Sequence, residues 1–153
     1  MPTNINRMHI PMNMETLLSI LIALQFAAFG WRIDREISVG DKGLRTWFPV
    51  ADFLNVASML FVTASCIILP MIGLHCQKLI NIALSLGFIL ITFHPINMAA
   101  HYRLFSRKGR TIYEGTETAY ITDQEKITLL ITALLMLTDM LLLLFPMHFA
   151  ATV

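Results

Sequence analysis

The sequence contains few charged residues and few cysteines, and each shortage disfavours particular classes of protein. Asp, Glu, Lys and Arg together make up 14% of its 153 residues, against roughly 25% in an ordinary soluble domain. Cys66 and Cys76 are too few for a disulfide framework and lack CxxC spacing. The formal net charge of +1 creates no large positive electrostatic field that would attract nucleic acid. The composition therefore disfavours a soluble domain, a disulfide-rich scaffold and a nucleic-acid-binding protein.

Catalytic motifs are missing as well. The chain contains no nucleophile elbow, no phosphate-binding glycine loop and no HExxH zinc motif. Each of these motifs places reactive or ligating groups at a fixed spacing, because the chemistry requires them to converge on one point. We therefore expect a protein that is not an enzyme.

Apolar residues make up 56% of the chain and are gathered in four long runs. The runs cover about residues 14–31, 53–74, 79–98 and 127–147. Each is close to the roughly 20 residues that cross a hydrocarbon core as a helix. The first apolar run follows a polar segment and does not end in a signal-peptidase cleavage pattern. We therefore expect it to remain in the protein as a membrane anchor. The sequence predicts an all-α integral membrane protein, with residues 1–153 forming one four-helix membrane domain.

Lysine and arginine are distributed unequally along the chain. The connections at about residues 32–52 and 99–126 hold nine of them, whereas the opposite side holds only Arg7 and Lys78. Cytoplasmic loops carry such an excess, so these two loops are expected to form a small cytoplasmic cap, with both termini non-cytoplasmic. The membrane would be a plasma membrane or a bacterial inner membrane. The basic cluster in the second loop is expected to contact anionic lipid or a partner; it consists of Arg107, Lys108 and Arg110.

One acidic residue, Asp139, falls inside the fourth run. An ionisable group within a span costs about 2.5–3.5 kcal/mol on insertion scales and normally faces the bundle interior. Counting depth along antiparallel helices places Asp139 near Asn81 and Ser85. Thr132 shares its helical face, and Ser65 lies at a similar depth. These residues are a predicted intramembrane polar site, serving either as hydrogen bonds between helices or as a proton or cation site.

A second polar layer is predicted nearer the cytoplasmic side, and it consists of Gln25, Asp52, Asn55 and His94. His94 is expected to bond Asp52 or a backbone carbonyl. Stable haem is not expected, because no histidine of another helix lies at the depth of His94. Thr122, followed three residues later by Glu125, fits a capping box and predicts the start of the last helix.

Imidazole and thiol groups gather at the predicted outer ends of the helices. They belong to His9, His75, Cys76 and His148, and several methionines lie nearby. Soft sulfur ligands together with imidazole suit Cu(I). The spacing matches no fixed ligand motif, however, so interfacial histidines and structural methionines are the preferred interpretation, and no cofactor is expected.

The absence of catalytic motifs, combined with two conspicuous cytoplasmic loops, favours a non-catalytic function. We expect a multi-pass subunit that self-assembles or docks a cytoplasmic partner, as an anchor or membrane sensor. Small membrane subunits of bacterial signalling or defence systems have this plan. One alternative is a small oligomeric ion channel or proton-coupled transporter centred on Asp139. A second is a copper-binding membrane protein.

Overall fold

The computed structural model describes residues 13–43, 48–105 and 121–145, and these form four long helical segments. The elements are α1 (Met14–Gly40), α2 (Val50–Thr63), a π-helical turn (Ala64–Ile68), α3 (Leu69–Met71), α4 (Gln77–His101) and α5 (Asp123–Leu144). Each of the four segments is long and apolar enough to cross a membrane. The described part of the chain is therefore all-helical and multi-pass, as the four apolar runs predict.

Helix α1 is longer than the first apolar run, ending at Gly40 rather than near Trp31. The low hydropathy of its charged C-terminal end is typical of a loop. Arg32 and Glu36, however, are four residues apart and form an ion pair of 2.6 Å on one helical face. At 27 residues, α1 is about 40 Å long, whereas the hydrocarbon core is about 30 Å thick. Its last turns therefore extend beyond the apolar run.

The second span is α2 continued through the π-helical turn into α3. Pro70 lies two residues after the turn, and its ring nitrogen cannot donate the usual helical hydrogen bond. A single π-turn accommodates such a break without ending the helix. The span closes at Gly73, whose φ of 84° is open to glycine without strain and lets the chain reverse into α4.

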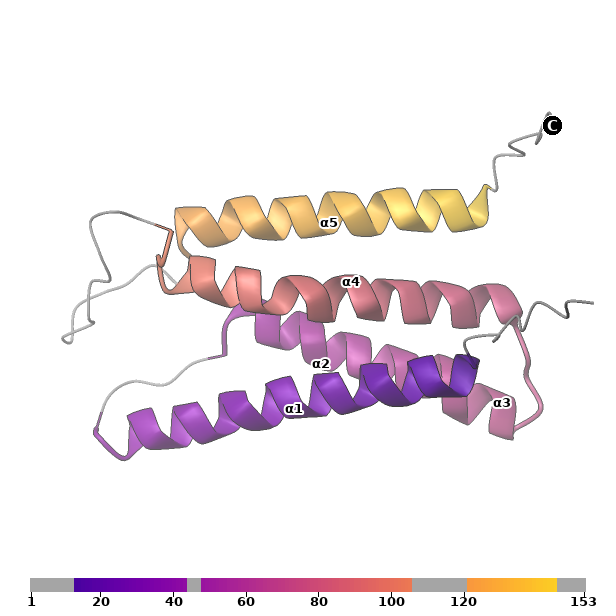
Figure 1. Ribbon diagram of the computed structural model, residues 1–153, viewed down its shortest axis with the longest axis horizontal. Coiled ribbons are helices and arrows are strands. Elements are labelled where there is room, and N and C mark those ends of the chain that lie inside the picture. The colour runs from indigo at the N-terminus through magenta and orange to yellow at the C-terminus, as the bar shows by residue number, and fades with distance from the viewer. Residues whose placement is uncertain (1–12, 44–47, 106–120, 146–153) are drawn as a thin grey trace, which may run out of the picture.

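Helix α4 is the central helix, and it packs against α1, α2 and α5. Helix α5 lies along one side of α4, with α1 and α2 on the other side (Figure 1). Because α5 packs mainly on α4, much of its surface is exposed apolar side chain, including Leu130, Leu134 and Leu141. In a membrane protein this surface faces lipid or another apolar helix.

The apolar core lies where α1, α2 and α4 meet, and it is formed by Leu21, Val62, Ala83 and Leu84. Gly87 permits this close approach. A Cβ atom at position 87 would lie 2.7 Å from Leu21 Cδ2 and 3.1 Å from Val62 Cγ2. Small residues at helix contacts of this kind let membrane helices pack closely.

Gly87→Val is expected to lower the free energy of unfolding by about 1–3 kcal/mol, because overpacking forces neighbouring side chains out of their rotamers. The measurement is unfolding in mixed detergent micelles. Gly30→Ala is the matched control, since nothing lies within 4 Å of its added Cβ. Alanine also has the higher helix propensity, by up to about 1 kcal/mol. Equal stability of the Gly87→Val variant and the wild type would contradict this packing.

Candidate functional site

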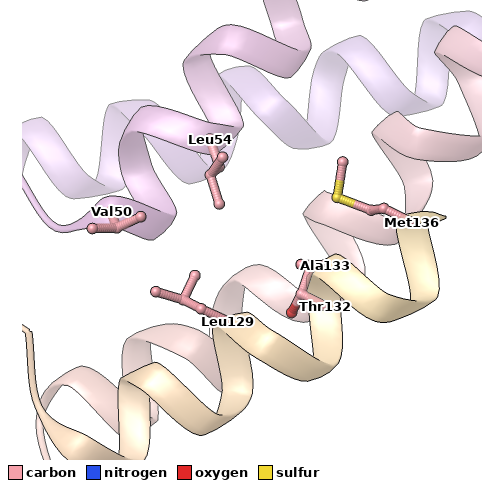
Figure 2. Close-up of a pocket in the computed structure, with 6 residues that line it drawn as sticks. All are labelled: Val50, Leu54, Leu129, Thr132, Ala133 and Met136. Carbon is pink, nitrogen blue, oxygen red and sulfur yellow. The ribbon is translucent and has the colours of Figure 1, made fainter.

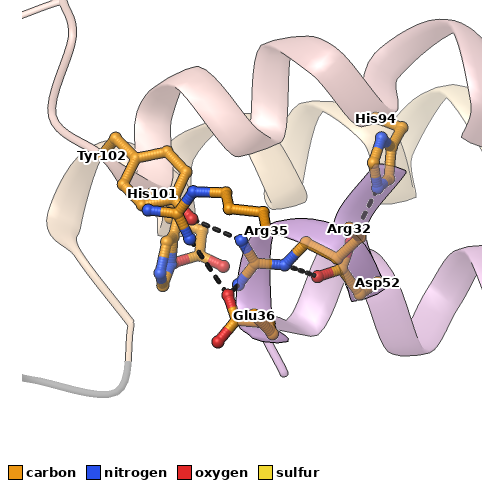
Figure 3. Close-up of polar contacts among 8 residues, drawn as sticks. Arg32, Arg35, Glu36, Asp52, His94, His101 and Tyr102 are labelled. Carbon is orange, nitrogen blue, oxygen red and sulfur yellow. Dashed lines mark hydrogen bonds and ion pairs between the residues drawn. The ribbon is translucent and has the colours of Figure 1, made fainter. Parts of the chain in front are cut away.

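A buried arginine connects three elements at one end of the bundle. Arg32 of α1 is only 2% exposed. Its Nε donates to Asp52 Oδ2 of α2 at 2.6 Å, and its Nη2 pairs with Glu36 Oε1. Its Nη1 donates to the phenol oxygen of Tyr102, the residue that follows α4. Figure 3 shows these groups converging around the guanidinium. The arginine therefore holds α1 to α2 and to the end of α4.

Asp52 also links α2 to α4. Its Oδ1 lies 2.8 Å from His94 Nε2 in a hydrogen bond, and both side chains are buried. Asp52 belongs to the first turn of α2, where the helix dipole favours a negative charge. One carboxylate thus accepts hydrogen bonds from Arg32 and His94 together. This is the His94–Asp52 contact that depth counting predicts.

A second histidine–carboxylate pair joins α4 to α5. His101 Nδ1 lies 2.7 Å from Glu125 Oε2, and Glu125 is completely buried. The Thr122 side chain accepts from the Glu125 backbone N–H at 3.1 Å, which confirms Thr122 as the N-cap of α5. The Thr122 hydroxyl also donates to the backbone oxygen of Ala100. The start of α5 is therefore attached to the end of α4 by two polar contacts.

The two histidine pairs are connected through Tyr102. The ring of His101 meets the Tyr102 ring edge-on with 5.1 Å between centroids, and the Arg35 guanidinium lies 4.3 Å from the centre of the Tyr102 ring. Burial raises the pKa of the Tyr102 phenol, and the charges of Arg32 and Arg35 offset part of that rise. The phenol is therefore a neutral link at physiological pH. Contacts run without a break from His94 to Glu125.

We call this set the charged layer; its charged members are Arg32, Arg35, Glu36, Asp52 and Glu125, and its histidines are His94 and His101. With neutral histidines, two positive charges face three negative ones, so the described layer has one excess negative charge. An uncompensated buried charge is costly. Histidine is the side chain whose ordinary pKa allows proton uptake between pH 5 and 8. One added proton would make the described layer neutral.

Neutral polar groups lie next to the charged layer on α1 and α2. Gln25 Nε2 donates to Ser58 Oγ at 2.9 Å, and Asn55 Nδ2 donates to the backbone oxygen of Gln25 at 3.3 Å. The structure thus buries all four residues of the predicted cytoplasmic-side layer and joins them as two bonded pairs, Asp52 with His94 and Asn55 with Gln25.

Several members of the charged layer were not predicted from the sequence. Arg32 and Glu36 resemble loop residues, because charge lowers hydropathy. The sequence pattern indicates Glu125 only as part of a capping box, whereas its side chain forms a hydrogen bond with His101. The seven-residue spacing of His94 and His101 on one helical face was the available signal, since it placed two titratable groups on one side of α4.

The structure distributes the predicted intramembrane site over several elements; its members are Ser65, Asn81, Ser85, Thr132 and Asp139. Among the described residues, no hydrogen bond joins any two of them. Asn81 is exposed and accepts from Gln77, whereas Thr132 accepts from Asn97 at 3.3 Å. Asp139 is half-buried, and its Oδ2 has no partner in the described part of the chain. A role for Asp139 in ion movement stays a prediction.

The predicted metal ligands are only partly within the described residues. His75 and Cys76 are exposed in the connection between α3 and α4, while His9 and His148 lie outside the described ranges. Across those ranges, no group of three or more His, Cys, Asp and Glu residues is placed to hold a metal. Copper binding therefore stays a prediction. Arg107, Lys108 and Arg110 also lie outside the described residues.

An apolar groove of about 350 Å³ lies between α2 and α5 (Figure 2); its lining residues are Val50, Leu54, Leu129, Thr132, Ala133 and Met136. Thr132 is the single polar lining residue, and its hydroxyl already bonds Asn97 and the Thr128 backbone oxygen. Both helices are candidate membrane spans. The lining therefore suits lipid hydrocarbon and offers no titratable group for chemistry.

Comparisons with protein-family models, with curated proteins and with solved structures find no match for this chain. The described fold and site define an all-helical, multi-pass membrane protein with a buried charged layer at one end of its bundle. The functional interpretation rests on the chemistry of that layer.

Proposed function

We propose that the chain is a proton-sensing membrane subunit, which docks a protein partner or further copies of itself through its connecting loops. One observation carries the proposal: a charged layer with two buried histidine–carboxylate pairs links all four spans, and its described residues carry one excess negative charge. Ionisable groups inside a membrane bundle cost free energy to bury, and they therefore commonly mark functional sites. Neutralising this excess with a proton gives the bundle two states with different internal charge.

The position of the layer explains how such a change could reach a partner. The end of α1, the start of α2, the end of α4 and the start of α5 lie at the same end of the bundle (Figure 1), and the charged layer joins these helix ends. The lysine and arginine count assigns this end to the cytoplasm. Helix α5 packs mainly on α4, and the His101–Glu125 pair fixes its start. Protonation of the layer would therefore tighten the start of α5 against the bundle.

The sensing proposal predicts a pH-dependent stability. Proton uptake by the folded state alone makes the stability rise as the pH falls, so the proposal predicts a rise between pH 8 and about 6. We expect the melting temperature in lipid nanodiscs to increase by about 2–4 °C, the shift for about 1 kcal/mol in a chain of this size. His94→Gln combined with His101→Gln should abolish the increase.

His75→Gln provides the control for this experiment, because His75 is exposed and lies outside the layer. Its melting temperature should follow the same pH dependence as the wild type. After correction for the intrinsic pH dependence of exchange, the first turn of α5 should exchange more slowly at pH 6 than at pH 8 in both proteins. An unchanged pH response in the double histidine variant would contradict proton uptake by the layer.

A proton-coupled transporter is the second candidate, because Asp139 has a buried carboxylate oxygen without a partner among the described residues. The packing favours sensing over transport. Val62 lies between Ser58 and Ser65 on the buried face of the second span, and it packs with Leu21 in the apolar core. These apolar side chains interrupt the polar stripe. Proton flux into liposomes would separate the candidates, since a sensor passes none.

A further inference from the structure

Two buried amide oxygens beside the charged layer lack hydrogen-bond donors. The amide nitrogens of Gln25 and Asn55 are both used, in bonds to Ser58 Oγ and to the Gln25 backbone oxygen. The Asn55 bond fixes the orientation of its amide, because a carbonyl oxygen can only accept and the amide nitrogen must donate. Gln25 Oε1 and Asn55 Oδ1 are buried and have no partner in the described part of the chain. Both residues are at most 2% exposed.

Unpartnered buried acceptors require an electropositive ligand. Leaving such an oxygen desolvated and unbonded costs about 1–3 kcal/mol, so native proteins pair nearly all of them with a donor, water or ion. The Gln25 and Asn55 amide oxygens and the Ser58 hydroxyl are neutral oxygen ligands from two adjacent helices. Neutral oxygens of this kind replace the hydration shell of a monovalent cation in selective channels.

The charge of the neighbouring layer indicates which cation fits. Asp52 lies three residues before Asn55 on the same buried face of α2, which places their side chains one helical turn apart. A monovalent cation would neutralise the excess negative charge of the described layer, whereas a divalent cation would replace it with an excess positive charge. We propose that Gln25, Asn55 and Ser58 form a binding site for a monovalent cation such as Na⁺.

The site has a consequence for sensing, and this step alone rests on the proposed function. A proton on the layer and a cation beside Asn55 neutralise the same excess charge, so each disfavours the other. The coupling is reciprocal, because linkage requires that protons weaken cation binding by the factor by which the cation weakens proton binding. The cation site would therefore shift the pH at which the subunit responds.

The experiment measures the melting temperature in nanodiscs at pH 8, as NaCl replaces N-methylglucamine chloride at constant ionic strength. The wild type should show a saturable rise of about 3–6 °C at ten times the dissociation constant. Asn55→Leu should abolish the rise. Asn97→Leu is the matched control, since Asn97 is an equally buried amide whose Oδ1 also lacks a described partner, but it contacts α5 through Thr132. It should respond like the wild type.

Equal melting temperatures of the wild type in sodium and N-methylglucamine salts would overturn the cation site and leave water as the ligand. Retention of the sodium effect in Asn55→Leu would also overturn it. If that variant does not fold, Ser58→Ala tests the same ligand set and should weaken the sodium response several-fold. Repeating the titration at pH 6 isolates the coupling: a weaker response supports it, and an unchanged response contradicts proton competition while the cation site stands.

Discussion

Arg32→Met is expected to lower the free energy of unfolding by about 3–5 kcal/mol, the usual cost of removing one partner from a buried ion pair. Methionine fills the space of the arginine stem but supplies no donor. Asp52 Oδ2 and Glu36 Oε1 would each lose a contact of 2.6 Å, and the excess negative charge of the described layer would rise from one to two. Unfolding in mixed detergent micelles measures the loss.

Two further variants test whether the loss of stability is specific to the buried Arg32 or follows the removal of any arginine. Arg35 is 28% exposed and contacts the same Glu36, so Arg35→Met should cost at most about 1 kcal/mol. Combining Arg32→Met with Asp52→Asn removes both charges of the central pair, and the double variant should be more stable than the sum of its single changes implies. Strict additivity would show that Arg32 and Asp52 do not act as a pair.

The four spans could be predicted from the sequence because the requirement they satisfy is local. A helix in lipid needs about 20 consecutive apolar residues, and this property is visible in one window of sequence. The same local measure misplaces the end of α1, because a hydropathy window assigns its charged residues to a solvent-exposed loop. Their burial depends on partners on other helices, and no window contains both Arg32 and Asp52.

Only part of the charged layer could be inferred from depth. Asp52 lies in the first turn of α2 and His94 in the last third of the antiparallel α4, so depth counting indicates Asp52 as one of the two expected partners of His94. Glu125 precedes the fourth apolar run, and its cap position indicated exposure. It is buried because Thr122 bonds the end of α4, which brings the first turn of α5 against His101. A contact set by tertiary packing of this kind has no signature in local sequence.

The second large effect is expected at Glu125. Glu125→Ala removes the carboxylate that bonds His101, and a hydrogen bond to a charged group contributes about 1.5–3 kcal/mol. Because α5 packs mainly on α4, the loss should appear as faster hydrogen exchange in its first turn, while the exchange of α2 remains slow. Asp123→Ala is the control, since Asp123 is exposed and pairs with Lys126 at the surface. Fast exchange throughout the bundle would contradict a local role for Glu125.

Glu125→Gln separates the charge of this residue from its packing. Glutamine keeps the side-chain length and an oxygen that can accept from His101, so the stability at pH 6 should fall less than in Glu125→Ala. The charge balance, however, changes completely: two positive charges then face two negative ones, and neutral histidines leave no excess. The layer no longer gains by binding a proton, although both histidines are present. We therefore expect this variant to lose the rise in melting temperature that the wild type shows between pH 8 and 6. A wild-type pH response in Glu125→Gln would mean that the histidines titrate independently of the layer's net charge, and that charge balance is not the origin of sensing.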